Sequence, residues 1–311
     1  MGTIRLKKQE DINSYVPSDA LLQISDMSKL LVRPLLLTGK PGTGKTQFAH
    51  WYANMNKIPI FQFNTKSTSV YSDLFYEYDA VSHFRNKKDD KSIADYITLT
   101  ALGKAIVCAK GIEKFADADI LKIISNSKLQ SNGRQSVVLI DEVDKAPRDF
   151  PNDLLHEIEK LSFTIKELNT DPIALEDEEM ENVVIILTSN NEKNLPDAFL
   201  RRCLFHFIEF PNDAQLYAIV KNKLGIADAN KTNLELLLAF FRKIYDNRNI
   251  DKQPSTSECI EWINYLHRKG MLEEPLDEKF QNSLSILLKK KEDFDEAVKA
   301  LADSNKQSTS A

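Results

Sequence analysis

Short apolar runs alternate with amphipathic stretches over the first two thirds of the chain. The runs are too short for helices and carry many β-branched residues, which is typical of strands buried on both faces. They lie at residues 35–38, 58–64, 137–140, 183–187 and 204–210. Apolar residues at helical spacing fall between them, at 18–31, 47–55, 98–110, 113–125, 148–161 and 196–201. This alternation predicts an α/β fold with a three-layer core around a five-stranded parallel sheet.

The strand pattern ends at Pro211, and only helical patterns follow it. They lie at residues 213–224, 231–246, 256–269 and 291–302 and predict a small α-helical lid domain. We therefore divide the chain into an N-terminal segment at 1–14, an α/β core at 15–211, the lid at 212–302 and a polar tail at 303–311. We expect the tail to be disordered because it has few apolar residues to bury.

Composition narrows the classes of function. The 311 residues carry a net charge of −5 with no basic stripe, which argues against a dedicated nucleic-acid binder. The three cysteines are widely separated and suggest no disulfide framework, as in a reducing compartment. No apolar run is long enough to cross a bilayer, and the N-terminus lacks the apolar core of a signal peptide. We expect a cytoplasmic protein without direct membrane insertion.

The strongest chemical signal follows the first apolar run. The segment from Gly39 to Thr46 matches the P-loop pattern G-x-x-x-x-G-K-[ST], with a predicted strand before it and a helix after it. Lys45 is expected to contact the β- and γ-phosphates of ATP, and the Thr46 hydroxyl to ligate Mg²⁺. The predicted nucleotide contacts are Gly39, Lys40, Pro41, Gly42, Thr43, Gly44, Lys45, Thr46 and the adjoining Gln47.

A second signal is the pair of carboxylates, Asp141 and Glu142, that ends the apolar run 137–140. A buried strand that ends in two acidic residues is the Walker B pattern of P-loop ATPases. Asp141 is expected to hold Mg²⁺ and to belong to the nucleotide site, and Glu142 to orient the attacking water. The two motifs together predict ATP hydrolysis.

Two further signals are weaker by themselves. Asn190 follows the next strand, where it can reach a γ-phosphate, although paired asparagines are also common in turns. Arg201 and Arg202 form a pair of a kind that is usually a surface feature, but beside an ATPase core they are candidates for an arginine finger. Residues 86–89 spell the guanine-binding motif N-K-x-D, which we reject because they precede the Walker B strand.

Five segments resemble those of MoxR-like AAA+ ATPases, from the clade with an insert in helix 2. They are RPLLLTGKPGTGKT at 33–46, TKSTSVYSDLFYEYDA at 65–80, VVLIDEVDKAPRDFPNDLLHEIE at 137–159, ILTSNNEKNLPDAFLRRC at 186–203 and PSTSECIEWI at 254–263. They occur in the family's order and extend over nearly the entire chain.

The resemblance implies a homo-oligomeric ring, usually a hexamer, that binds ATP between subunits and acts as a chaperone on a protein client. Such a client often carries a von Willebrand factor A domain. The resemblance also implies that Asn190 is sensor 1 and that Arg202, in preference to Arg201, is the arginine finger. Residues 67–80 correspond to the helix-2 insert and 163–181 to the hairpin before sensor 1. Candidates for client contact in the insert are Tyr71, Phe75, Tyr76 and Tyr78.

The sequence departs from these relatives in two places. Where many of them carry a sensor 2 arginine in the lid, this chain has Glu258, and either Lys252 or Arg268 would have to substitute. The stretch 109–135 is longer than expected, and we expect a partner-specific helix there. Two alternatives remain open: a nucleic-acid-dependent or GTP-dependent AAA+ motor, and a nucleotide-gated scaffold with little turnover.

Overall fold

The computed structural model describes residues 15–85, 91–129, 133–148, 150–168, 170–190, 192–226, 231–272 and 278–308. The expected N-terminal segment 1–14 and the rejected motif at 86–89 lie outside these residues. The described chain divides into two compact units. One contains Pro17–Gly39 and Lys45–Ile208, and the other contains Lys40–Gly44 with the residues from Glu209 onward.

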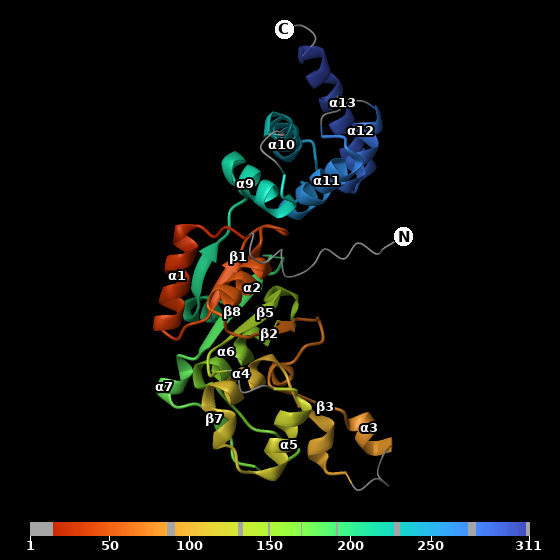
Figure 1. Cartoon of the computed structure of the whole chain (residues 1–311). Coiled ribbons are helices and arrows are strands. Elements are labelled where there is room, and N and C mark those ends of the chain that lie inside the picture. The colour runs from red at the N-terminus through yellow and green to blue at the C-terminus, as the bar shows by residue number, and fades with distance from the viewer. Residues whose placement is uncertain are drawn as a thin grey trace. The chain divides into compact units, whose positions relative to one another are not determined.

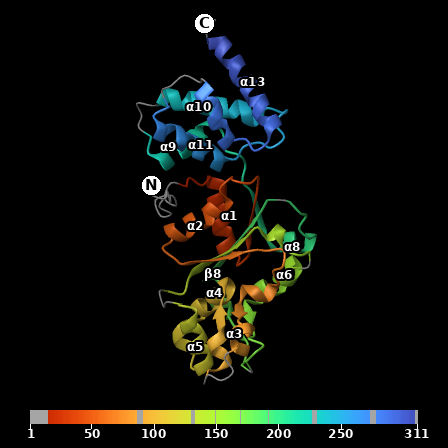
Figure 2. The same ribbon diagram turned by 90° about the vertical axis from the view of Figure 1, so that its right-hand side faces the viewer.

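The first unit is built around a five-stranded parallel sheet (Figures 1 and 2). Its strands follow the spatial order β2-β5-β8-β1-β9, and every neighbouring pair is parallel. The predicted fold class is therefore confirmed. The strands are β1 (Leu35–Thr38), β2 (Ile60–Asn64), β5 (Ser136–Asp141), β8 (Val183–Ser189) and β9 (Leu204–Phe207).

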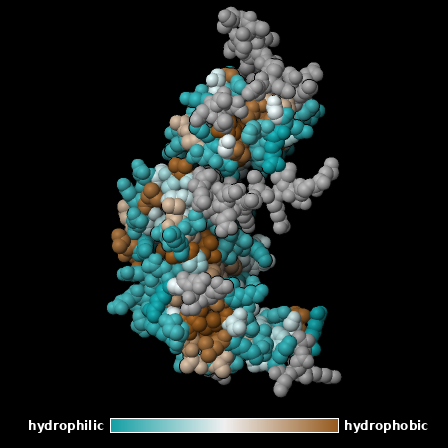
Figure 3. Space-filling view, in the orientation of Figure 1, coloured by the Kyte–Doolittle hydropathy of each residue, from teal (hydrophilic) through white to brown (hydrophobic). Residues whose placement is uncertain are grey.

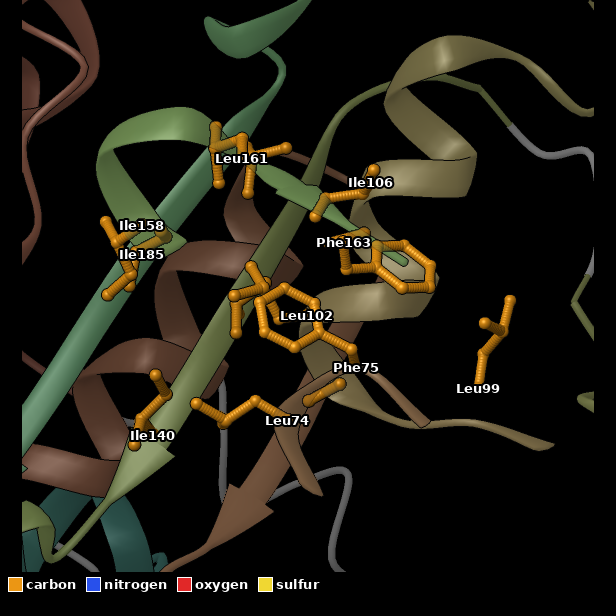
Figure 4. Packing of buried hydrophobic residues seen from close by; sticks show 14 of the residues in the cluster. Leu74, Phe75, Leu99, Leu102, Ile106, Ile140, Ile158, Leu161, Phe163 and Ile185 are labelled. Carbon is orange, nitrogen blue, oxygen red and sulfur yellow. The ribbon is translucent and has the colours of Figure 1, made fainter. Parts of the chain in front are cut away.

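Helices cover both faces of this sheet. Because side chains alternate between the faces of a strand, Leu36, Val138 and Ile140 point to one face, where they pack with the helices after the insert. Figure 4 shows part of this cluster, including Ile140. Those helices are α4 (Ala101–Lys110), α5 (Ala118–Asn126), α6 (Phe150–Lys160) and α8 (Asp197–Arg202). On the other face lie α1 (Asp19–Leu30) and α2 (Lys45–Met55), which contact the central strands.

Two short antiparallel pairs of strands lie outside the five-stranded sheet. In the first pair, β3 (Tyr76–Tyr78) of the insert pairs with β4 (Ile97–Leu99), so the helix predicted from residue 98 begins only at Ala101. The second pair joins β6 (Ser162–Phe163) to β7 (Ile173–Ala174). Three short helices in and after the insert were not predicted: η1 (Tyr71–Leu74), α3 (Ala80–Arg85) and η2 (Ile93–Tyr96).

The long stretch 109–135 does contain a helix, α5, after the short η3 (Ile112–Lys114). The apolar face of α5 is buried, with Ile120, Ile123 and Ile124 at most 5% exposed in the core of the same unit. The side chains on this face are therefore used for internal packing. A further short helix, α7 (Asp177–Met180), lies within the segment 163–181, which the resemblance assigned to the hairpin before sensor 1.

The second unit is helical beyond Glu209. Three helices have the predicted bounds: α9 (Asp213–Leu224), α10 (Lys231–Asp246) and α11 (Thr256–Lys269). The short elements α12 (Glu278–Ser283) and η6 (Leu284–Ile286) were not predicted. The last helix, α13 (Lys291–Ser308), is longer than the predicted 291–302 and continues through residues 303–308.

Trp262 is the largest fully buried side chain of the helical unit, and its Nε1 donates to Ser283 Oγ at 2.9 Å. The face of the molecule in Figure 3 is mostly hydrophilic, with apolar patches between the polar side chains. Among the described residues, no helix has both the length and the apolar character needed to cross a bilayer.

Candidate nucleotide site

The P-loop connects the end of β1 to the start of α2, as its pattern predicted. Gly42 and Gly44 adopt φ angles of 74° and 95°, which favour glycine because a Cβ atom strains the backbone there. The Lys45 side chain is buried, and its Nζ donates to the Gly39 carbonyl oxygen at 2.8 Å. Burial lowers the pKa of Lys45, and the nearby carboxylates of Asp144, Asp141 and Glu142 oppose that shift.

Asp141 is the centre of a small polar network at the carboxyl end of the sheet. Its Oδ1 accepts hydrogen bonds from the Thr46 hydroxyl at 2.8 Å and from the Thr188 hydroxyl at 2.6 Å. Its Oδ2 lies 3.4 Å from Gln62 Nε2. Sheet register explains this convergence, because Ile140 pairs with Leu187 and Asn64 with Asp141, so the ends of three strands meet at one edge.

Glu142 leaves the strand in a left-handed conformation, with φ 57° and ψ 51°. A side chain in this region costs about 1–2 kcal/mol relative to right-handed backbone. The Glu142 backbone N–H donates to Thr188 Oγ1 at 2.8 Å, which helps to hold the turn in place. Its carboxylate accepts from Asn190 Nδ2 at 3.3 Å and forms an ion pair with Lys145. That ion pair raises the pKa of Lys145.

Asp144 links the Walker B turn to the loop that carries Asn190. It is 2% exposed, and its Oδ2 accepts from the backbone N–H of Asn190 at 3.1 Å and of Glu192 at 2.9 Å. Charge-assisted bonds to backbone N–H groups are about twice as strong as neutral ones. Asp144 therefore holds the position of the sensor 1 candidate relative to Glu142.

The structure thus brings Lys45, Thr46, Asp141, Glu142 and Asn190 into one site, as expected from the sequence. Asn191, the other asparagine of that motif, lies outside the described residues. The sequence interpretation did not assign roles to three residues that take part: Thr188, Asp144 and Lys145. All three stand within the quoted motifs. Thr188 could have been found from the sequence, because it lies at the end of the strand next to the one that ends at Asp141.

The remaining P-loop residues and Gln47 make few contacts that bear on catalysis. Pro41 and Lys40 are exposed, Thr43 donates its hydroxyl hydrogen to the Lys40 carbonyl oxygen at 2.9 Å, and Gln47 is half-buried in the first turn of α2. Lys40, which belongs to the second unit, donates to Gln253 Oε1 at 2.7 Å within that unit.

Arg202 is not part of this cluster. It ends α8, and its guanidinium pairs with Glu159 of α6 and donates to the Ala198 carbonyl oxygen at 3.4 Å. Both partners of the ion pair are about half exposed, at 45% and 51%. Exposed pairs of this kind contribute about 0–1 kcal/mol, so other anions can replace Glu159 at little cost.

Glu258, where the resemblance led us to look for a sensor 2 arginine, has a local structural role. It lies three residues after Ser255 at the start of α11, and its Oε2 accepts from Ser255 N at 2.8 Å and from Ser255 Oγ at 2.9 Å. Ser255 Oγ accepts in turn from Glu258 N at 3.3 Å. The pair is a capping box that stabilises the helix start.

A P-loop after β1, with paired carboxylates at the end of the nearby parallel strand β5, defines a P-loop nucleotide-binding domain. The model of the "ATPase family associated with various cellular activities (AAA)" matches residues 35–212, more than half of the chain. The chain therefore belongs to the AAA family of ATPases.

One curated relative is also similar. It is an "ATP-dependent zinc metalloprotease FtsH homolog" of Helicosporidium sp. subsp. Simulium jonesii, 36% identical over 77 residues. The match covers 24% of this chain and only 5% of that protein. Within the part of the chain that the structure describes, no group of three or more His, Cys, Asp or Glu side chains is arranged to hold a metal ion.

Proposed function

We propose that this chain is a ring-forming, Mg²⁺-dependent ATP hydrolase that remodels a protein partner, as MoxR-like ATPases do. The observation that supports hydrolysis best is the network that joins Thr46, Asp141, Thr188 and Glu142 at one sheet edge. It sets a hydroxyl, a carboxylate and a second carboxylate beside the P-loop, which are the groups that phosphoryl transfer to water requires.

The oxygen donors of Thr46 and Asp141 suit Mg²⁺, which prefers hard oxygen ligands and keeps several waters and phosphate oxygens. Their side-chain oxygens lie 2.8 Å apart, so both can face one ion. When bound, Mg²⁺ supplies positive charge that neutralises the phosphates. Lys45 would exchange the Gly39 carbonyl for the β- and γ-phosphates, and Glu142 would orient and polarise the attacking water.

A ring is supported by the position of Arg202, which ends α8 just before the strand β9. Leu204, which follows Arg202 closely, pairs with Leu35 at the start of β1, whereas the P-loop follows Thr38 at its end. The three steps from Leu35 to Thr38 along β1 separate these ends by about 10 Å. That distance exceeds the length of an arginine side chain, so Arg202 would act on the nucleotide of a neighbouring subunit.

The insert is the proposed client-binding region, but not all four aromatic residues expected to contact the client are available. Phe75 is 2% exposed and stacks on Phe163 at 5.2 Å, so it is a core residue and not a client contact (Figure 4). Tyr76 and Tyr78 instead line a cleft of about 880 Å³ beside Asp79 and Tyr96. We propose that this cleft contacts the client, which would be a von Willebrand factor A domain protein if the likeness to MoxR extends to its partner.

The decisive experiment measures steady-state ATP hydrolysis per protomer over a range of protein concentrations. Wild type is compared with Glu142→Gln and Arg202→Ala, and binding of a fluorescent ATP analogue is measured for each. Arg134→Ala is the matched control, because Arg134 also forms an exposed ion pair, with Glu113 at 3.0 Å, away from the site.

We expect specific activity to rise with concentration, both site variants to lose turnover while they still bind nucleotide, and the control to behave as wild type. Activity that is independent of concentration and unaffected by Arg202→Ala would refute the shared site. Turnover that survives Glu142→Gln would refute the catalytic assignment. Stimulation by DNA or RNA with a steep salt dependence would favour the motor alternative.

A further inference from the structure

Arg33 makes an unusual set of contacts for a residue outside the nucleotide site. Its Nε donates to the Arg202 carbonyl oxygen at 3.1 Å, and its Nη2 donates to the carbonyl oxygens of Arg201 at 2.5 Å and Cys203 at 3.3 Å. The three acceptors are consecutive backbone carbonyls at the end of α8. One guanidinium therefore binds all three carbonyl groups of the turn that contains Arg202, the candidate arginine finger.

This turn needs such a donor. The last carbonyl groups of a helix have no partner within it and carry partial negative charge, so a cation there is favourable. The planar fork of arginine can satisfy several acceptors at once, which a lysine ammonium on a flexible stem does less well. Arg33 caps α8 from a residue distant in sequence, across a separation of 169 positions to Arg202.

The backbone of Arg33 itself is held in a well-packed part of the core. Arg33 stands directly before Pro34, whose carbonyl oxygen accepts from Leu204 N at 2.8 Å, and before β1, whose residues 35–37 are 0% exposed. The P-loop follows the same strand. The backbone of Arg202 is thus held to the strand that carries the P-loop, while its side chain makes an exposed ion pair with Glu159 and a long hydrogen bond to the Ala198 carbonyl oxygen at 3.4 Å.

We propose that Arg33 is a positioning residue for the arginine finger: it fixes the backbone of Arg202 so that the guanidinium reaches the nucleotide of the adjacent subunit. This inference rests on the proposed action of Arg202 between subunits. The proposal predicts which of two adjacent subunits is affected when Arg33 is lost. Loss of Arg33 impairs hydrolysis in the neighbour that receives the finger and spares hydrolysis in the subunit's own site.

The test uses mixtures of two inactive variants. Arg202→Ala subunits keep a complete site but give no finger, and Glu142→Gln subunits give a finger but do not hydrolyse ATP. We expect each variant alone to be inactive and the mixture to regain turnover. Arg33→Ala is then added either to the finger donor, as Arg33→Ala with Glu142→Gln, or to the acceptor, as Arg33→Ala with Arg202→Ala.

The donor placement should lower the regained kcat about 10- to 100-fold, since displacement of a catalytic group by about 1 Å can cost that much. The acceptor placement should leave kcat and the KM for ATP unchanged. Arg33→Lys in the donor should recover part of the activity. Melting temperature and binding of a fluorescent ATP analogue verify that each double variant is folded.

The possible failures are distinguishable. Equal losses from both placements would show a general structural role and overturn the inference, as would full recovery with the Arg33→Ala donor. If Arg202→Ala alone keeps wild-type turnover, the proposed finger fails and the inference fails with it. An inactive Arg202→Ala with a fully competent Arg33→Ala donor would refute the role of Arg33 alone.

Discussion

The Thr188 hydroxyl donates to Asp141 Oδ1 at 2.6 Å and at the same time accepts the Glu142 backbone N–H at 2.8 Å. One side chain on β8 thus fixes both Asp141, the last residue of β5, and Glu142, which follows it. The two strands are neighbours in the sheet, with Ile140 paired to Leu187. Thr188 therefore couples the end of β5 to the turn that carries Glu142, and a change at Thr188 should affect both.

Replacement of Thr188 by Val should lower both stability and turnover. The change keeps the shape of the side chain but removes both hydrogen bonds, and a buried N–H without an acceptor costs about 1–3 kcal/mol. We expect the free energy of unfolding to fall by that amount and kcat to fall at least tenfold. Urea unfolding and steady-state kinetics measure these effects, and Thr188→Ser, which keeps the hydroxyl, is the control. Equal kinetics for the Val and Ser variants would contradict the prediction.

Glycine at position 142 should separate backbone strain from catalysis. Glu142 lies in the left-handed region at φ 57°, where glycine has no steric penalty. Glu142→Gly and Glu142→Ala both remove the carboxylate and its ion pair with Lys145, so both should be inactive. The Gly variant should nevertheless be more stable than the Ala variant by about 1 kcal/mol. Thermal or urea unfolding of the two proteins decides this, and an Ala variant that is as stable would argue against strain.

Removal of the Asp144 carboxylate should loosen the loop that carries Asn190. Asp144→Ala leaves the N–H groups of Asn190 and Glu192 without their acceptor, at a cost of about 1–3 kcal/mol each if no water replaces it. We expect a fall in kcat with little change in the KM for ATP. Faster amide exchange at Asn190 and Glu192 would support the mechanism directly. Asp144→Asn keeps an acceptor oxygen and should be the milder change, so an Asn variant that is worse than Ala would contradict this account.

The three cysteines should react slowly with thiol reagents while the protein is folded. Burial raises the pKa of Cys108 to about 11 and that of Cys203 to about 12, from an ordinary value of 9.0, and it also raises the pKa of Cys259. The reactive thiolate is therefore scarce in the folded state at pH 8. A colorimetric thiol reagent should react slowly with native protein and fully with protein in guanidinium.

The same pKa shifts imply a pH dependence of stability. The folded state holds the thiol protons to higher pH than the unfolded state, so this contribution to stability is complete below pH 9. It should be lost as the pH rises from about 9 towards 12. Replacement of Cys203 by Ala should make the decline in the free energy of unfolding shallower in that range. An unchanged decline would show that other groups are responsible.

The sequence by itself determined the features that depend on neighbours along the chain. A P-loop needs glycines at defined offsets before a lysine, and a buried parallel strand needs a continuous apolar run, so Gly39–Thr46 and 137–140 were recognisable. Three helices of the second unit had the predicted bounds, and two of them end at the left-handed glycines Gly225 and Gly270, which are recognisable stop signals in the sequence. The short strands β3 and β4 were missed because three residues carry too little periodicity.

Only the tertiary structure decided which of these residues touch. The bonds of Thr188 to the Asp141–Glu142 turn, the hold of Asp144 on the Asn190 loop and the grip of Arg33 on the end of α8 all join distant segments. They follow from sheet order and register, which no local pattern encodes. The left-handed turn at Glu142 is of the same kind, because a non-glycine residue keeps that backbone only where surrounding contacts hold it.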